Sequence, residues 1–135
     1  MQMARVVIVE DDKMNAKVFD AVLRKRGGFD VKITEDVQEV LDLARSGQAD
    51  LVIMDVSLAS SQLDGKPMNG LSISRLLKDD ARTASIPVII ATAHAMKGDR
   101  ERFLEQSKAD DYVSKPIMDQ KALIQKIKAL IEKQA

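Results

Sequence analysis

Short apolar runs alternate with helical patterns along the whole of this chain. Five of these runs are rich in β-branched or aromatic residues and are bounded by turn or charged residues, which is typical of strands buried on both faces of a sheet. The pattern predicts strands at residues 6–9, 30–33, 51–54, 88–91 and 112–113.

The segments between and after these strands repeat their apolar residues with the period of an α-helix. Three helix faces are predicted in this way: Met14, Val18, Ala21 and Val22; Val37, Val40, Leu41 and Ala44; and Leu123, Ile127, Leu130 and Ile131. Two further helices are expected over residues 71–78 and 97–106. Gly27 and Gly28 are expected to end the first helix, because glycine readily adopts the left-handed conformation found there.

Alternating strands and helices indicate a parallel sheet with right-handed crossovers and helices on both faces. The sequence therefore predicts one doubly wound α/β domain over residues 1–135, with five strands and five helices. Ligands of such domains bind beyond the carboxyl ends of the strands. The longest stretch without a helix or strand pattern, residues 56–69, is interpreted as a loop beside that site.

Composition and charge narrow the class of protein. The chain has 135 residues, 45% of them hydrophobic and 31% charged, which suits a globular domain with one core. Its 21 basic and 21 acidic residues give zero net charge, which argues against DNA or membrane-surface binding. The absence of cysteine excludes disulfides and thiolate metal sites. Without an export signal or a long apolar run, the cytoplasm is the expected compartment.

Chemically active side chains follow four of the predicted strands. Glu10 and Asp11 follow the first strand, Asp55 the third, Thr92 the fourth and Lys115 the fifth. Because the carboxyl ends of parallel strands share one edge, the acids are expected to converge, which costs free energy unless a cation lies between them. Oxygen ligands with room for water suit Mg²⁺.

The same edge has the groups needed to hold a phosphoryl group. Lys115 can neutralise its charge and Thr92 can donate a hydrogen bond to it. Asp55 lies at the centre of the set, and a carboxylate can act as the nucleophile toward phosphorus, giving an aspartyl phosphate. Taken singly, an Asp that closes a strand is more often a cap or turn residue, and a lone acidic pair or Ser-Lys-Pro is equally weak evidence, so the hypothesis depends on the whole set in this order.

Four short motifs resemble those of the receiver domains of two-component response regulators. They are Val9-Glu10-Asp11-Asp12, Ile53-Met54-Asp55, Ala91-Thr92-Ala93 and Tyr112-Val113-Ser114-Lys115-Pro116. The resemblance covers nearly all of the chain and is strongest to stand-alone, DivK-type receivers and to those attached to hybrid kinases. It implies a flavodoxin-like sheet with strand order 2-1-3-4-5.

The resemblance also implies a role for each matching residue. Asp55 would be the phosphoacceptor, and Mg²⁺ would be held by Glu10, Asp11, Asp55 and the backbone carbonyl of Ser57. Thr92, Ala93 and Lys115 would contact the phosphoryl oxygens. Thr92 and Tyr112 would form the switch, and the peptide bond between Lys115 and Pro116 would be cis.

The partners are implied by the family as well. A sensor histidine kinase or a histidine phosphotransfer protein would supply the phosphoryl group, docking near Met14, Asn15 and Val18. With no further chain after residue 135 to form an output domain, the protein is expected to signal to a downstream protein target by surface contact, as a monomer or weak dimer. No contact with DNA or membrane is expected, and no enzymatic activity beyond its own phosphorylation and dephosphorylation.

Three other classes of protein are alternatives to this interpretation. An aspartate-dependent phosphatase usually has a second acid two residues after its nucleophile, where this chain has Ser57. A flavodoxin-like cofactor carrier would have a phosphate-binding loop after the first strand, where acids would repel anions. A pseudo-receiver would bind partners without being phosphorylated. The segment between Asp55 and Gly70, longer than is usual in the family, could alter partner choice or phosphate lifetime, or could be a plain surface loop.

Overall fold

The computed structural model describes residues 3–58, 62–93, 98–115 and 117–134. Its main sheet has five parallel strands in the order β2-β1-β3-β6-β7. The elements are, in chain order, β1 Arg5–Val9, α1 Lys13–Lys25, β2 Asp30–Thr34, α2 Val37–Arg45, β3 Leu51–Asp55, β4 Gln62–Leu63, β5 Lys66–Pro67, α3 Gly70–Asp79, β6 Val88–Thr92, α4 Asp99–Ser107, β7 Asp111–Ser114 and α5 Gln120–Gln134.

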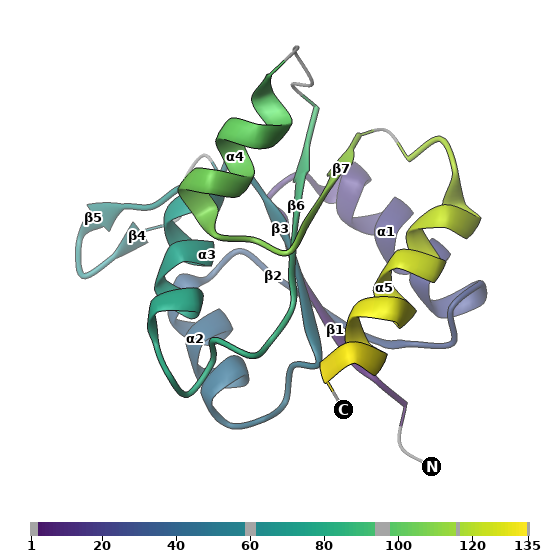
Figure 1. The fold of residues 1–135 in the computed structure, drawn as a ribbon, viewed down its shortest axis with the longest axis horizontal. Coiled ribbons are helices and arrows are strands. Elements are labelled where there is room, and N and C mark those ends of the chain that lie inside the picture. The colour runs from purple at the N-terminus through teal and green to yellow at the C-terminus, as the bar shows by residue number, and fades with distance from the viewer. Residues whose placement is uncertain (1–2, 59–61, 94–97, 116, 135) are drawn as a thin grey trace.

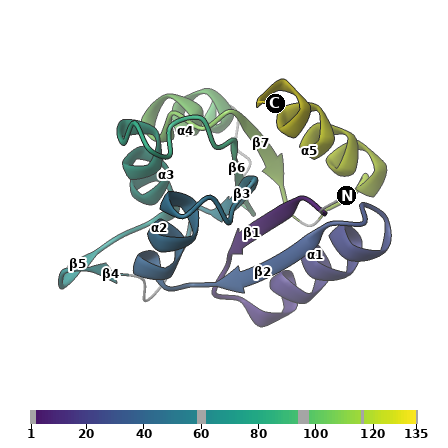
Figure 2. The ribbon, with the colours of Figure 1, turned by 90° about the horizontal axis from the view of Figure 1, so that it is seen from below.

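Helices cover both faces of the sheet (Figures 1 and 2). On one face α1 and α5 pack through Phe19, Leu23 and Ile127 against the strands, and on the other α2, α3 and α4 pack through residues such as Val40 and Ile73. β3 is buried along its whole length because it lies at the centre of the sheet. The doubly wound fold and the implied strand order are confirmed.

The five predicted strands and five predicted helices are all found, with ends that differ by a few residues. Asp12 begins α1 as its N-cap, where its side chain accepts a hydrogen bond from the backbone N–H of Asn15. Gly28 follows the end of α1 with a φ of 67°, a conformation that glycine adopts without strain. The expected start of α4 at Lys97 lies outside the described residues.

The predicted apolar face of α1 is wrong. Met14 is 74% exposed and Val18 47% exposed, and of the predicted set Val22 alone is buried. The buried face consists of Ala16, Phe19, Val22 and Leu23. Two overlapping apolar series run along this helix, and the larger Phe19 and Leu23 side chains remove more surface from water, so they determine which side faces the sheet.

The segment expected to be a plain loop after β3 contains a short hairpin. β4 and β5 pair antiparallel, and Figure 1 shows them projecting from the body of the domain beside α2 and α3. Asp64 and Gly65 connect them with φ values of 52° and 78°, as a two-residue hairpin turn requires. Leu63 packs against the core on the α2 side and fixes the hairpin there. The Asp-Gly pair was the available sequence signal.

Among the residues that the structure describes, no helix combines the length and the apolar character needed to cross a membrane.

Candidate functional site: an acidic pocket with a buried lysine

The pocket forms at the carboxyl edge of the sheet because the strand register brings three chain segments together. Val9 pairs with Met54 in the β1–β3 ladder, so the next residues, Glu10 and Asp55, are neighbours. The backbone N–H of Lys115 donates a 2.8 Å hydrogen bond to the carbonyl of Thr92, which continues the β6–β7 ladder beyond the strand end. The strand register therefore brings side chains that are far apart in sequence together at this edge of the sheet.

Lys115 lies between two of the acids. Its Nζ atom donates to Glu10 Oε1 at 2.8 Å and to Asp55 Oδ1 at 3.0 Å. The three side chains are nearly inaccessible, with exposed fractions of 8% for Lys115, 2% for Glu10 and 6% for Asp55. Charged groups with so little hydration depend on one another for stabilisation.

Burial and the neighbouring charges shift two pKa values in the pocket. Burial is the largest influence on Glu10 and raises the pKa of its carboxyl above the ordinary 4.5, with Asp55 adding to the rise and Lys115 opposing it. Burial opposes the charged form of Lys115, but its hydrogen bonds to Glu10 and Asp55 outweigh this, and the pKa of Lys115 is raised above 10.5. The lysine is therefore fully charged at neutral pH.

A third acid completes the cluster. Carboxylate oxygens of Glu10, Asp11 and Asp55 all lie within 4.8 Å of one another. Hard oxygen donors at this spacing are what Mg²⁺ prefers, and the half-buried Asp11 leaves one side open to water. Asp12 serves as the cap of α1 and is not in the cluster. Three acids against one lysine leave the pocket with excess negative charge, so its donor set fits a divalent cation.

Gly70, which sequence reasoning did not select, determines how closely α3 approaches the pocket. A Cβ atom on Gly70 would lie 1.8 Å from the backbone oxygen of Asp55, a distance that no side chain can tolerate. Its N–H also donates to the carbonyl of Val56 at 3.1 Å. Glycine at this helix start therefore lets α3 pack directly on the end of β3 and hold the Asp55 backbone in place. A glycine just after a helix N-cap was a visible but unspecific signal.

The predicted switch residues lie on neighbouring strands behind the pocket. Thr92 and Tyr112 are both buried, and β6 pairs with β7 so that Ile90 faces Tyr112 and Thr92 faces Ser114. The Tyr112 ring stacks on Phe103 of α4, with ring centroids 6.5 Å apart. Phe103 was missed because nothing in the sequence indicated which aromatic residue would lie opposite Tyr112.

The remaining predicted site residues are placed as follows. Ser57 and Ala93 are exposed at the ends of β3 and β6, and the Ser57 backbone N–H donates to Asp55 Oδ1 at 3.4 Å. Met14 and Val18 lie on the exposed side of α1, with Asn15 half-buried beside them. The expected cis peptide involves Pro116, which lies outside the described residues.

The fold and the pocket together define the class of protein: a doubly wound α/β domain with an aspartate, two further acids and a lysine at the carboxyl edge of its sheet. The family model for the response regulator receiver domain matches residues 6–128. The chain belongs to this family, as its motifs indicated, and a receiver domain has no catalytic activity beyond its own phosphorylation chemistry.

The chain is also similar over most of its length to individual proteins with this domain. It is 41% identical over 112 residues to the polar-differentiation response regulator DivK of Brucella anthropi, covering 83% of this chain and 84% of that one. It is 27% identical to the receiver domain of a Pseudomonas aeruginosa sensor histidine kinase, with a TM-score of 0.79 over 97% of this chain and 99% of that one. That structure has a magnesium ion coordinated in its active-site cleft. A sensor protein from Polaromonas sp. JS666 is 25% identical, with a TM-score of 0.80 over 99% and 100% of the two chains.

Proposed function

We propose that this protein is a DivK-like response regulator that accepts a phosphoryl group on Asp55 and signals through protein contacts. The observation that carries the proposal is the position of Asp55, buried at the end of the central strand with the Lys115 ammonium 3.0 Å from one carboxylate oxygen. Glu10 and Asp11 supply further negative charge beside it. An aspartate with a purely structural role would be paired with one lysine, whereas Asp55 shares Lys115 with Glu10 and has a third acid beside it.

The reaction is the transfer of a phosphoryl group from a phosphohistidine on a sensor histidine kinase or a histidine phosphotransfer protein. A carboxylate oxygen of Asp55 forms a bond to phosphorus while the bond from phosphorus to the donor imidazole breaks, and the imidazole nitrogen keeps the electron pair. Lys115 is placed to neutralise the added charge. Hydrolysis of the acyl phosphate by water returns the free carboxylate and inorganic phosphate.

Magnesium is the cofactor that the pocket fits. Glu10, Asp11 and Asp55 would hold it together with the backbone carbonyl of Ser57, and it would supply positive charge to the phosphoryl oxygens when bound. The relative from Pseudomonas aeruginosa binds magnesium in the corresponding kind of cleft, which supports this assignment. One lysine cannot neutralise three carboxylates, so Mg²⁺ and Lys115 would together neutralise the negative charge of the pocket.

Thr92 and Tyr112 are proposed to report the phosphorylated state. The Thr92 hydroxyl and the Ala93 backbone N–H would donate hydrogen bonds to the phosphoryl oxygens, and movement of Thr92 would open space behind it for the Tyr112 ring. The contact of Tyr112 with Phe103 connects such a movement to α4. The surface of α4, β7 and α5 would then differ between the two states.

The remaining assignments concern partners and setting. Met14 and Val18 are exposed apolar side chains on the first half of α1, with the half-buried Asn15 beside them, which suits docking of the phosphodonor. We further propose a single receiver domain acting in the cytoplasm as a monomer or weak dimer, with a downstream protein target and without contact to DNA.

The decisive experiment is phosphorylation with a small phosphodonor and Mg²⁺, followed by intact-mass measurement. Wild-type protein should gain one phosphoryl group, and Asp55→Asn should gain none. Asp12→Asn is the matched control, because it removes a nearby acid but keeps a good helix cap, and it should be labelled like wild type. Labelling of Asp55→Asn would contradict the proposal, and absence of labelling in wild type would favour a pseudo-receiver.

A further inference from the structure

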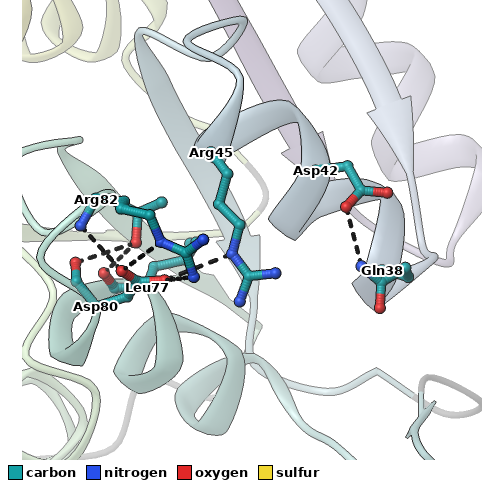
Figure 3. A network of polar contacts seen from close by, with 7 residues as sticks. Gln38, Asp42, Arg45, Leu77, Asp80 and Arg82 are labelled. Atoms are coloured by element: carbon teal, nitrogen blue, oxygen red, sulfur yellow. Dashed lines mark hydrogen bonds and ion pairs between the residues drawn. The ribbon is translucent and has the colours of Figure 1, made fainter.

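The cations on the two faces of the molecule differ in their pairing. On the α2–α3 side, Arg45 and Arg82 both reach Asp80 (Figure 3), and the hydrogen bonds from Arg82 lower the pKa of Asp80 to about 2. On the other face, the ion pairs of α1 and α5 join Asp20 with Arg24 and Lys126 with Asp111. Within the part of the chain that the structure describes, the other cations of these two helices and the α1 C-cap have no ion-pair partner.

Three of these cations surround a hollow between the two helices. α1 and α5 lie side by side on this face of the sheet in both views (Figures 1 and 2). Where the end of α1 meets the first half of α5 there is a groove of about 400 Å³, lined by Arg26, Lys121, Ile124, Gln125 and Lys128. The lining contains three cations and no acid, and Ile124, buried in the core, forms the floor between them.

Two of the cations of this groove lie along one side of α5. Lys121 lies in the first turn, and the helix start is capped by Asp119, whose carboxylate accepts a 2.9 Å hydrogen bond from the backbone N–H of Ala122. Lys128 is two turns further along the same side of α5. Glu132, one turn beyond Lys128, is exposed and does not line the groove.

We propose that this groove, hereafter the α1–α5 groove, binds an acidic amphipathic helix of a partner protein. Carboxylates of that helix would pair with Arg26, Lys121 and Lys128, while its apolar side chains would cover the aliphatic stems of the lysines above the groove floor. Complementary charge would direct the encounter and fix the register of the helix. The groove is separate from the acidic pocket, so this surface is additional to the phosphodonor surface proposed on α1.

The same lining disfavours other anionic ligands. A small anion is normally held by polar groups that converge inside a pocket, whereas these three cations are exposed and separated along two helices. Nucleic acid binding would be helped by aromatic side chains for stacking and by a basic protein overall, but the lining has no aromatic residue and the net charge is zero.

The test is an NMR titration of the unphosphorylated protein with a synthetic peptide helix that has glutamates on one face and leucines on the other. Using unphosphorylated protein makes the result independent of the assignment of Asp55. Backbone amide shifts should cluster at Arg26 and at Lys121 to Lys128, and affinity should fall as salt is added. A scrambled peptide of the same composition, which cannot form an apolar face, should bind at least about tenfold more weakly.

Two triple variants distinguish binding in the groove from a general effect of positive charge on the protein. Arg26→Glu, Lys121→Glu and Lys128→Glu together should weaken binding of the amphipathic peptide by roughly tenfold or more. The control, Lys17→Glu, Lys66→Glu and Lys133→Glu together, makes the same change in charge at exposed positions outside the groove and should weaken binding by less than about threefold. Thermal unfolding of each variant checks that it folds.

The outcomes that overturn the proposal are distinct. Equal weakening by both triple variants would mean that only overall charge matters. Equal binding of the scrambled peptide would exclude an amphipathic helix as the ligand. Amide shifts outside the groove would show that the peptide binds elsewhere. Tighter binding of a DNA duplex or of anionic phosphatidylserine vesicles than of the peptide would show that an acidic helix is not the ligand of the groove.

Discussion

Lys115 and Lys78 bury their ammonium groups at opposite edges of the same sheet, in surroundings of different charge balance. Lys78, with a side chain 10% exposed, pairs with Asp110 at 2.6 Å and donates to the carbonyls of Ala84 and Ile86 at 3.2 and 2.8 Å. Lys115, with a side chain 8% exposed, pairs with both Glu10 and Asp55.

The difference shows how a structural lysine can be told from a functional one. Lys78 meets one acid and two neutral carbonyls, and Asp110 also accepts from the backbone N–H of Val88, so α3 is tied to the starts of β6 and β7 with charges balanced. Around Lys115 one ammonium group is shared by Glu10 and Asp55, with Asp11 close beside them, so acids outnumber the lysine. A balanced network stabilises the fold, whereas an unbalanced one stores free energy of charge repulsion that a bound cation can release.

The largest expected effect comes from removing each lysine in turn. Lys78→Met should lower the free energy of unfolding by about 2–3 kcal/mol, because it leaves two carbonyls and a partly hydrated carboxylate without their donor. Lys115→Met should cost a similar amount in metal-free buffer, and in saturating Mg²⁺, which replaces the missing positive charge, its deficit relative to wild type in the same buffer should shrink. The deficit of Lys78→Met relative to wild type should stay the same, because its pocket is intact. Denaturant unfolding of all three proteins in EDTA and in Mg²⁺ measures these differences, and an equal reduction of both deficits would contradict the distinction between the networks.

Loss of a metal ligand should give the next largest effect. Asp11→Ala should weaken Mg²⁺ binding by roughly tenfold to a hundredfold, since loss of a direct ligand costs at least as much as loss of a group that orients one. Calorimetry on wild type and variant measures the affinity, with Asp12→Asn as the control for a neighbouring acid outside the cluster. Unchanged affinity in Asp11→Ala would mean that the metal binds elsewhere.

A smaller effect is expected from pH acting on Glu10. Because the folded-state pKa of Glu10 is raised above 4.5, the folded protein binds more protons than the unfolded chain above that pH, and this carboxyl therefore lowers stability as pH rises through and beyond 4.5. Glu10→Gln should remove the loss. In EDTA, the difference in unfolding free energy between variant and wild type should become more favourable to the variant from pH 4 to pH 7. A constant difference would show that Glu10 is not destabilised by ionisation.

The smallest effect, without a change in stability, is expected at Tyr112. With a beryllofluoride phosphate mimic on Asp55, the NMR signals of the Tyr112 and Phe103 rings should shift together in wild type and stay in place in Thr92→Ala, because Thr92 would carry the movement. Fluorine or methyl signals elsewhere in the core serve as the reference. Wild-type rings that do not respond at full occupancy of Asp55 would make Tyr112 an ordinary packing residue.

The strands and the acidic pocket were predictable because their signals are short in range. A strand buried on both faces must be apolar at every position, as in residues 51–54, and the residue that follows it must lie at the sheet edge. Parallel pairing then brings Glu10, Asp55 and Lys115 together whatever the intervening segments do. The Asp-Gly pair is a sequence signal for the turn of the β4–β5 hairpin. The hairpin was not predicted, because the residues around that pair show no strand pattern.

By itself the sequence determined the fold class, the order of the chemical groups along one sheet edge and the family, because each depends on residue type and on the periodicity of nearby positions. The tertiary structure alone decided which side of α1 is buried, which of two buried lysines is charge-balanced and that Arg26 shares a groove with Lys121 and Lys128. These features depend on which segments pack against one another across the sheet. Packing sums many weak contacts between residues distant in sequence, so no local pattern encodes it.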